Sequence, residues 1–270
     1  MGSMDITRDR SGDTIPTYVY ASTHIHSKTI CTAFADGSNL TLLSADKYVK
    51  GHAVVYGRLR GCNEIIASAK FHGYNWYYID RGYLRATRDQ DYSGYFRITK
   101  NALQCDGLGR GELERFQKLH LHIKDWRQNG DHILICPPGK AFADLSKFDA
   151  DKWTRNIISQ LRQYTDRELR IRPKPLKNQR VKSLLSDLNN CWAVVTHSSN
   201  SAVEALLKGI PVFCTDICAS YHMGYSDLSK IETPYYPDDR LRWAITLASN
   251  QWTLDEFKSG LTWSMLNKAG

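Results

Sequence analysis

The sequence predicts an α/β protein built from two doubly wound domains, each a parallel sheet covered by helices. Short runs rich in β-branched and aromatic residues alternate with helical patterns over residues 15–79. A second alternation of the same kind occupies residues 132–214. Between the two series, Asn129-Gly130-Asp131 is a turn-forming cluster of the kind expected at a domain junction.

In the first half, strands are expected where apolar residues form short runs, and helices where they recur every three or four positions. The expected strands are residues 15–22, 52–56, 76–79 and 95–99. The expected helices are residues 27–35, 62–71 and 112–126. The β-α-β-α-β order of the first five elements favours parallel strands joined by crossover helices.

The second half repeats this pattern. Its expected strands are residues 132–136, 169–172, 193–196 and 212–214, and its expected helices are residues 150–164, 179–188 and 201–208. Ser201 and Glu204 have the spacing of a capping box, and Gly209 stands where a left-handed C-terminal cap is expected. Thr253 and Glu256 form a second capping box, ahead of a helix that is expected to cross back over the first domain.

The expected domain limits are therefore residues 15–130, residues 131–250, and a final helical segment, 251–270, that packs on the first domain. Residues 1–14 are expected to be a loose terminus that begins with a vector-derived Met1-Gly2-Ser3. No apolar run approaches the roughly 20 residues needed to span a bilayer, and no signal peptide is visible. A soluble, cytoplasmic protein is expected.

Composition narrows the class of partner. The seven cysteines among 270 residues are widely spaced, which argues against a secreted disulfide framework and favours free thiols. The formal net charge of +8 makes polyanions plausible partners: nucleic acid, anionic lipid surfaces or phosphorylated substrates. No metal site is expected, because the cysteine and histidine spacings do not match a chelate.

A phosphate site is predicted where the strand at residues 193–196 meets the next helix. A helix that follows a parallel strand directs free N–H groups toward the carboxyl edge of the sheet, although a polar turn taken alone is more often only a cap. Arg172 and Lys174 are two apart at another strand end and are expected to project to the same side. The predicted phosphate-binding residues are Arg172, Lys174, His197, Ser198, Ser199, Asn200 and Ser201.

The first half supplies candidate proton acceptors. Transfer to a hydroxyl needs a base, and His24, His26 and Asp80 lie at or just beyond strand ends. Each of them is also able to serve only as a cap or hydrogen-bonding group. No Gly-x-Gly-x-x-Gly follows a strand, and neither a Walker sequence nor a nucleophile elbow is present. Dehydrogenase, nucleotide triphosphatase and serine hydrolase chemistry are therefore disfavoured.

Three segments together resemble a known family. They are Thr196–Pro211 with its Ser-Asn-Ser, Glu-Ala-Leu and Gly-Ile-Pro, Ile79–Arg85, and Arg172-Pro173-Lys174-Pro175. In order and spacing they resemble the GT-B glycosyltransferases, especially the capsule-polysaccharide and Kdo-transferase-like group. The segment Asn250–Phe257 is similar to the ending of short bacteriophage glycosyltransferases.

The resemblance implies two facing Rossmann-like domains with a cleft between them and a C-terminal crossover helix. It implies a metal-independent hexosyltransferase that uses a nucleotide sugar, expected to be UDP-linked, and no other cofactor. Asp80, His24 and His26 would be catalytic. The donor diphosphate would lie on Ser198–Ser201 with Arg172 and Lys174, while Glu204 or Glu232 would bind the ribose.

Double-stranded DNA is the acceptor that the sequence favours, by a small margin. Phages glycosylate hydroxymethylpyrimidines in their own DNA, and an enzyme that flips a base needs basic residues for the phosphates. The expected acceptor-side residues are Arg58, Arg60, Arg81 and Arg85, with Arg88 and Arg110 adding to the charge. One alternative is a glycosyltransferase that acts on a bacterial surface saccharide of the capsule or Kdo type. A non-catalytic, glycosyltransferase-like DNA-binding module is the other.

Overall fold

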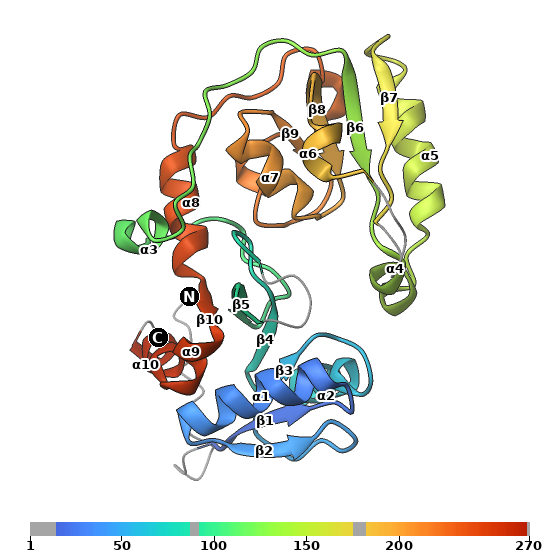
Figure 1. Ribbon diagram of the computed structural model, residues 1–270. Coiled ribbons are helices and arrows are strands. Elements are labelled where there is room, and N and C mark those ends of the chain that lie inside the picture. The colour runs from blue at the N-terminus through green and yellow to red at the C-terminus, as the bar shows by residue number, and fades with distance from the viewer. Residues whose placement is uncertain (1–14, 87–91, 175–181, 269–270) are drawn as a thin grey trace. The chain divides into compact units, whose positions relative to one another are not determined.

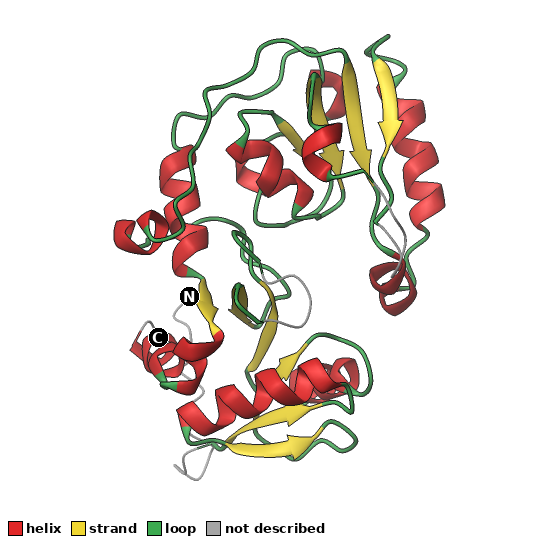
Figure 2. Ribbon diagram, viewed as in Figure 1, coloured by secondary structure: helices red, strands yellow, loops and turns green. Residues whose placement is uncertain are grey.

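The computed structural model describes residues 15–86, 92–174 and 182–268, and the chain divides into two compact units (Figures 1 and 2). Unit 1 contains the chain up to Leu103 together with the C-terminal segment from Asn250. Unit 2 is Gln104–Ser249. Within the described residues, no helix is both long and apolar enough to cross a membrane.

The division falls earlier than the turn cluster at residues 129–131 suggests. Residues 104–130 group with unit 2 because their backbone is bonded to it: Lys124 N–H donates to Leu207 O at 3.0 Å, and Arg127 N–H donates to Gly209 O at 2.7 Å. These bonds hold an extended chain where the sequence predicts a helix over residues 112–126. Only α3 (Leu113–Gln117) is helical there, so that part of the prediction is wrong.

Unit 1 is built on one six-stranded sheet in the order β10-β5-β4-β3-β1-β2. Strands β1 to β4 are parallel, whereas β5 is antiparallel to β4 and β10 is antiparallel to β5. The strands are β1 (Thr17–Ala21), β2 (Thr41–Ser44), β3 (His52–Tyr56), β4 (Trp76–Arg81), β5 (Tyr95–Lys100) and β10 (Gln251–Thr253). Four of them match expected strands, while β2 and β10 were not expected.

Helices cover both faces of this sheet. Because successive strand residues face opposite sides, Val19 and Val54 pack with α1 (Ile25–Ser38), whereas Tyr20 and Val55 pack with α2 (Cys62–Phe71). Two further helices, α9 (Leu254–Lys258) and α10 (Leu261–Lys268), join the α1 side. In Figure 1 they lie beside β10.

The C-terminal capping box is confirmed. Thr253 Oγ1 accepts the Glu256 N–H at 3.2 Å, and Glu256 Oε2 accepts the Thr253 N–H at 2.8 Å. The expected continuous helix is nevertheless interrupted at Gly260, which has a φ of 75°. A Cβ at Gly260 would lie 2.2 Å from Gly37 O, so the close approach to α1 requires glycine.

Unit 2 is built on a four-stranded parallel sheet in the order β7-β6-β8-β9. The strands are β6 (His132–Cys136), β7 (Glu168–Ile171), β8 (Cys191–Thr196) and β9 (Val212–Cys214). The other helices are α4 (Lys140–Ser146), α5 (Ala150–Leu161), α6 (Leu184–Asp187), α7 (Ser201–Leu207) and α8 (Arg240–Ser249). All four strands match expectation, whereas α4 and α8 were not expected. Of the helix expected over 179–188, residues 179–181 lie outside the described residues.

Candidate active site

The turn after β1 brings two candidate histidines together at the carboxyl edge of the unit 1 sheet. His24 caps α1, because its Nδ1 accepts the backbone N–H of His26 at 3.3 Å. The two imidazole rings are 4.9 Å apart. The Nδ1 atom of His26 is 2.7 Å from the hydroxyl of Tyr92. Among the described residues no group bonds the Nε2 atom of His26, which therefore remains available for a substrate proton.

Asp80, at the end of β4, is held by three donors. Its Oδ2 atom accepts from Tyr78 at 2.9 Å and from Arg97 at 3.0 Å, and its Oδ1 atom accepts the Arg81 N–H at 2.8 Å. Burial, and then the charge of Asp80, raises the pKa of Tyr78 well above its ordinary value. Tyr78 therefore stays protonated and donates a hydrogen bond to Asp80. Both carboxylate oxygens of Asp80 are therefore bonded, whereas the Nε2 atom of His26 has no partner among the described residues.

Tyr56 lies on the strand between these two groups. It ends β3, and burial is the main cause that raises its pKa to about 12; the charge of Asp80 also raises it, and that of Arg81 lowers it. Tyr92 also raises the pKa of Tyr56. His26 follows β1 and Asp80 ends β4, and because these strands are parallel both residues lie at the carboxyl edge of the unit 1 sheet. The structure thus places the two residues at one edge of the sheet, with β3 between the strands that carry them.

The expected acceptor-side arginines lie at the same ends of β3 and β4. Arg60, Arg81 and Arg85 are exposed, and Arg58 is half-buried with its Nε atom 3.0 Å from Asn63 Oδ1. Within the described residues, the other two expected arginines, Arg88 and Arg110, do not join these four. Arg88 lies outside that part of the chain, and Arg110 belongs to unit 2.

In unit 2, the residue after β8 is a buried histidine inside an aromatic box. The ring of His197 is 4.7 Å from that of Phe148, 5.3 Å from Phe142 and 6.3 Å from Trp153. Its Nδ1 atom is 3.1 Å from Ser198 Oγ and 3.7 Å from Asp216 Oδ2. Burial lowers the pKa of His197, and Asp216 only partly opposes this. The neutral imidazole is therefore favoured.

The polar turn that follows bonds largely to itself. Ser199 N–H donates to Thr196 Oγ1 at 3.3 Å, and Ser201 N–H donates to Ser199 Oγ at 3.2 Å. The expected capping box at Ser201 and Glu204 is wrong, because the N-cap is Asn200, which already has helical angles (φ −62°, ψ −9°). Glu204 lies in the first turn of α7. Fewer backbone N–H groups are free here than the sequence suggests.

The remaining expected donor residues take separate positions. The Arg172 guanidinium pairs with the carboxylate of Asp187 in α6. Lys174 instead packs over Gly139, because a Cβ atom added to Gly139 would lie 2.8 Å from Lys174 Cδ. The two side chains thus diverge. Glu232 pairs with Arg167, just before β7, and so lies at the amino edge of the sheet, opposite to His197.

Sequence reasoning missed the aromatic groups that surround the candidate histidines. Phe142, Phe148 and Trp153 enclose His197, and Tyr92 contacts His26. The periodicity around Trp153 indicates only a helix face, and Phe142 lies on α4, which is too short to give a periodic pattern. Nothing in the sequence near Tyr92 points to His26, 66 positions away.

The fold and the polar strand ends define a mixed α/β protein with a glycosyltransferase-like fold. No protein-family model matches the chain, and no curated protein matches it by sequence. Within the described residues, no group of three or more histidine, cysteine or acidic residues is placed to hold a metal ion.

Among the solved structures that this chain resembles are two of KpsC from Thermosulfurimonas dismutans. The beta Kdo 2,4 transferase is 14% identical, with a TM-score of 0.52, over 89% of this chain and 92% of that one. The beta Kdo 2,7 transferase is 15% identical, with a TM-score of 0.51, over 92% of this chain and 99% of that one. At these identities the likeness concerns the fold.

Proposed function

We propose that this protein is a glycosyltransferase that moves a sugar from a nucleotide-sugar donor to a hydroxyl group of a bacterial surface saccharide. The observation that carries the proposal is the likeness to two Kdo transferases over nearly the whole length of both chains. The polar carboxyl edge of each sheet adds support, because open α/β sheets bind ligands at that edge.

In unit 1, His26 is the proposed base. If its Nδ1–H donates to Tyr92, the Nε2 lone pair takes the proton of the acceptor hydroxyl. The acceptor oxygen then bonds to the anomeric carbon of the donor sugar, and the bond from that carbon to the phosphate oxygen breaks. The nucleotide leaves with the electron pair. Asp80 keeps Tyr78 and Arg97 in place at the end of β4.

In unit 2, the proposed donor-binding residues are Lys174, His197 and the side chains of Ser198, Ser199 and Asn200. Lys174 is exposed at the carboxyl end of β7 and supplies a charge for a phosphate oxygen. Neutral His197, fixed by its aromatic box, orients Ser198. A UDP-linked donor is proposed, and no metal is required if cationic side chains neutralise the leaving phosphate.

A saccharide acceptor is favoured over DNA. Both structural neighbours are Kdo transferases, whereas the case for hydroxymethylated DNA rests on arginines at the ends of β3 and β4 and on the similarity of Asn250–Phe257 to phage enzymes. Exposed arginines also suit an acidic saccharide, since guanidinium groups bind carboxylates in a bidentate manner. Two alternatives remain as outcomes of the test: double-stranded DNA receives the sugar, or the protein binds DNA without catalysis.

The test incubates the protein with a panel of nucleotide sugars and either capsule-type oligosaccharides or hydroxymethylated DNA, and weighs the products. The proposal expects the oligosaccharide to gain the mass of one sugar. It expects His26→Gln to lower the rate at least a hundredfold, a loss typical of a missing general base, and His122→Gln, at an exposed histidine, to leave it unchanged. A gain of mass by DNA alone would overturn the acceptor assignment.

The donor site has its own test. Lys174→Gln should weaken nucleotide-sugar binding, measured by calorimetry, by about tenfold, because one charge-assisted contact is lost. Lys118→Gln, at an exposed lysine of unit 2, is the matched control and should have no effect. Equal affinity of the Lys174→Gln variant and the unmodified protein would remove Lys174 from the donor site.

A further inference from the structure

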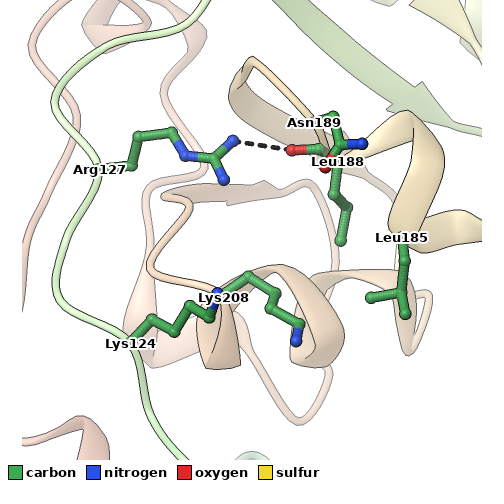
Figure 3. Close-up of a pocket in the computed structure, with 6 residues that line it drawn as sticks. All are labelled: Lys124, Arg127, Leu185, Leu188, Asn189 and Lys208. Atoms are coloured by element: carbon green, nitrogen blue, oxygen red, sulfur yellow. Dashed lines mark hydrogen bonds between the residues drawn. The ribbon is translucent and has the colours of Figure 1, made fainter.

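A second basic site lies at the amino edge of the unit 2 sheet, away from His197. It is a cavity of about 160 Å³, shown in Figure 3, that is lined by Lys124, Arg127, Leu185, Leu188, Asn189 and Lys208. Its walls adjoin Cys191, the first residue of β8, and the turn before β9. At roughly 30 Å³ per water molecule, the cavity has room for about five waters or one hydrated oxyanion.

The lining of this cavity is cationic. Three of its six lining residues are cations, and none is acidic. Arg127 uses one amino group to bond the carbonyls of Leu188 at 2.7 Å and Cys191 at 3.3 Å, and the first of these bonds is drawn in Figure 3. Neither Lys124 nor Lys208 forms an ion pair within the part of the chain that the structure describes. Cations gathered in this way repel one another unless an anion joins them.

The backbone that carries these cations is fixed before any ligand binds. Lys124 N–H and Arg127 N–H are bonded to the carbonyls of Leu207 and Gly209, and Arg240 donates to the carbonyls of Lys124 and Leu206 at 2.8 and 3.0 Å. Gly209 has a φ of 72°, which brings Asp125 O so close that a Cβ would lie 1.9 Å from it. Such a frame reduces the ordering cost of binding.

We propose that this cavity binds a phosphoryl group. A multiply charged oxyanion matches three cations better than a monoanion does, and the Nε and Nη2 atoms of Arg127, which have no bond to the described residues, suit its oxygens. Leu185 and Leu188 form an apolar wall on which the remainder of a phosphorylated molecule would rest. The site is separate from the proposed donor site, since it lies at the opposite edge of the same sheet.

Calorimetry with inorganic phosphate and with glucose 1-phosphate tests this proposal, using the full chain at low and at high salt. Saturable binding is expected for the unmodified protein. The double variant Lys124→Gln/Lys208→Gln should weaken it at least tenfold, while Lys118→Gln/Lys230→Gln removes the same charge from exposed lysines elsewhere in unit 2 and should not. A thermal melt of each variant verifies that it is folded.

The two probes and the two double variants distinguish the possible ligands and explanations. Tighter binding of glucose 1-phosphate than of inorganic phosphate identifies a phosphorylated saccharide as the ligand, and equal binding identifies the free ion; both support the site. The proposal is overturned if the two double variants lose affinity equally, since net charge alone would then explain binding. It is also overturned if neither probe binds, or if only Lys174→Gln abolishes binding, which would assign the phosphate to the donor site.

Discussion

Histidines in similar positions along the chain have different surroundings in the two units. His197 directly follows a strand, as the sequence predicts, but it is buried among Phe142, Phe148 and Trp153. His26 follows a strand and a short turn, is half-buried, and keeps Nε2 open among the described residues. The position of a histidine at a strand end could be predicted from periodicity, whereas its protonation could not, because this depends on rings that are distant in sequence.

Acid should destabilise the protein through His197. Because burial lowers the folded-state pKa of this group below its ordinary 6.5, the unfolded chain binds more protons in that range. The free energy of unfolding should therefore fall as the pH drops through 6.5 toward the folded pKa. Melting temperatures of the unmodified protein and of His197→Asn, measured between pH 7.5 and 5, give the two slopes.

The slope of His197→Asn should be the shallower one, while His122→Asn, at an exposed histidine, should keep the full slope. If all three proteins lose stability in parallel, His197 does not carry the effect.

At the scale of elements, the best-predicted parts are those whose residues contact one another locally. The strand, turn and helix of residues 191–214 are close to expectation, although β8 begins at Cys191 and not at Ala193, because the apolar runs of β8 and β9 and the glycine after α7 lie within that segment. Residues 118–126 belong to the predicted helix over 112–126 but are irregular in the structure, because the backbone of this segment bonds to the end of α7 about 80 positions later. Periodicity contains no information about such bonds.

The turn after α7 should depend on glycine for two reasons at once. Gly209→Ala forces a φ of 72° on alanine and also brings its Cβ against Asp125 O. Gly73→Ala is the matched comparison, since φ is 76° there and no atom lies within 4 Å. The conformational effect alone should cost about 1–2 kcal/mol, and the clash should add about 1–3 kcal/mol at Gly209.

Thermal and denaturant unfolding of the two variants give these values. Equal losses of stability at Gly209 and Gly73 would mean that the chain relaxes around the added methyl group and that the contact with Asp125 is unimportant.

At the scale of the whole chain, unit 1 is completed by residues from both of its ends. Gln251 of β10 is fully buried, and its Oε1 atom accepts the N–H groups of Tyr83 and Leu84, each at 2.9 Å. Its Nε2 atom donates to Leu84 O at 2.9 Å. The sequence suggested that the last segment returns to the first half, but β10 was not foreseen, because three residues give no strand pattern without their partner β5.

Removing this amide should destabilise unit 1 strongly. Gln251→Leu leaves two buried N–H groups and one carbonyl without their partner, which should cost about 3 kcal/mol or more. Gln117→Leu, at an exposed position, should change stability by less than about 0.5 kcal/mol. Hydrogen exchange of the Tyr83 and Leu84 amides would report the effect locally, and unchanged protection in Gln251→Leu would contradict it.

The central claim is sugar transfer, and the most direct measurement of it is the ratio of nucleotide released to sugar attached, followed in one reaction with an oligosaccharide acceptor. If the protein is a glycosyltransferase, one nucleotide is released for each sugar attached. His26→Gln should then reduce the formation of both products by the same factor. Release of nucleotide without attachment to any saccharide, or no release with any donor, would contradict the claim.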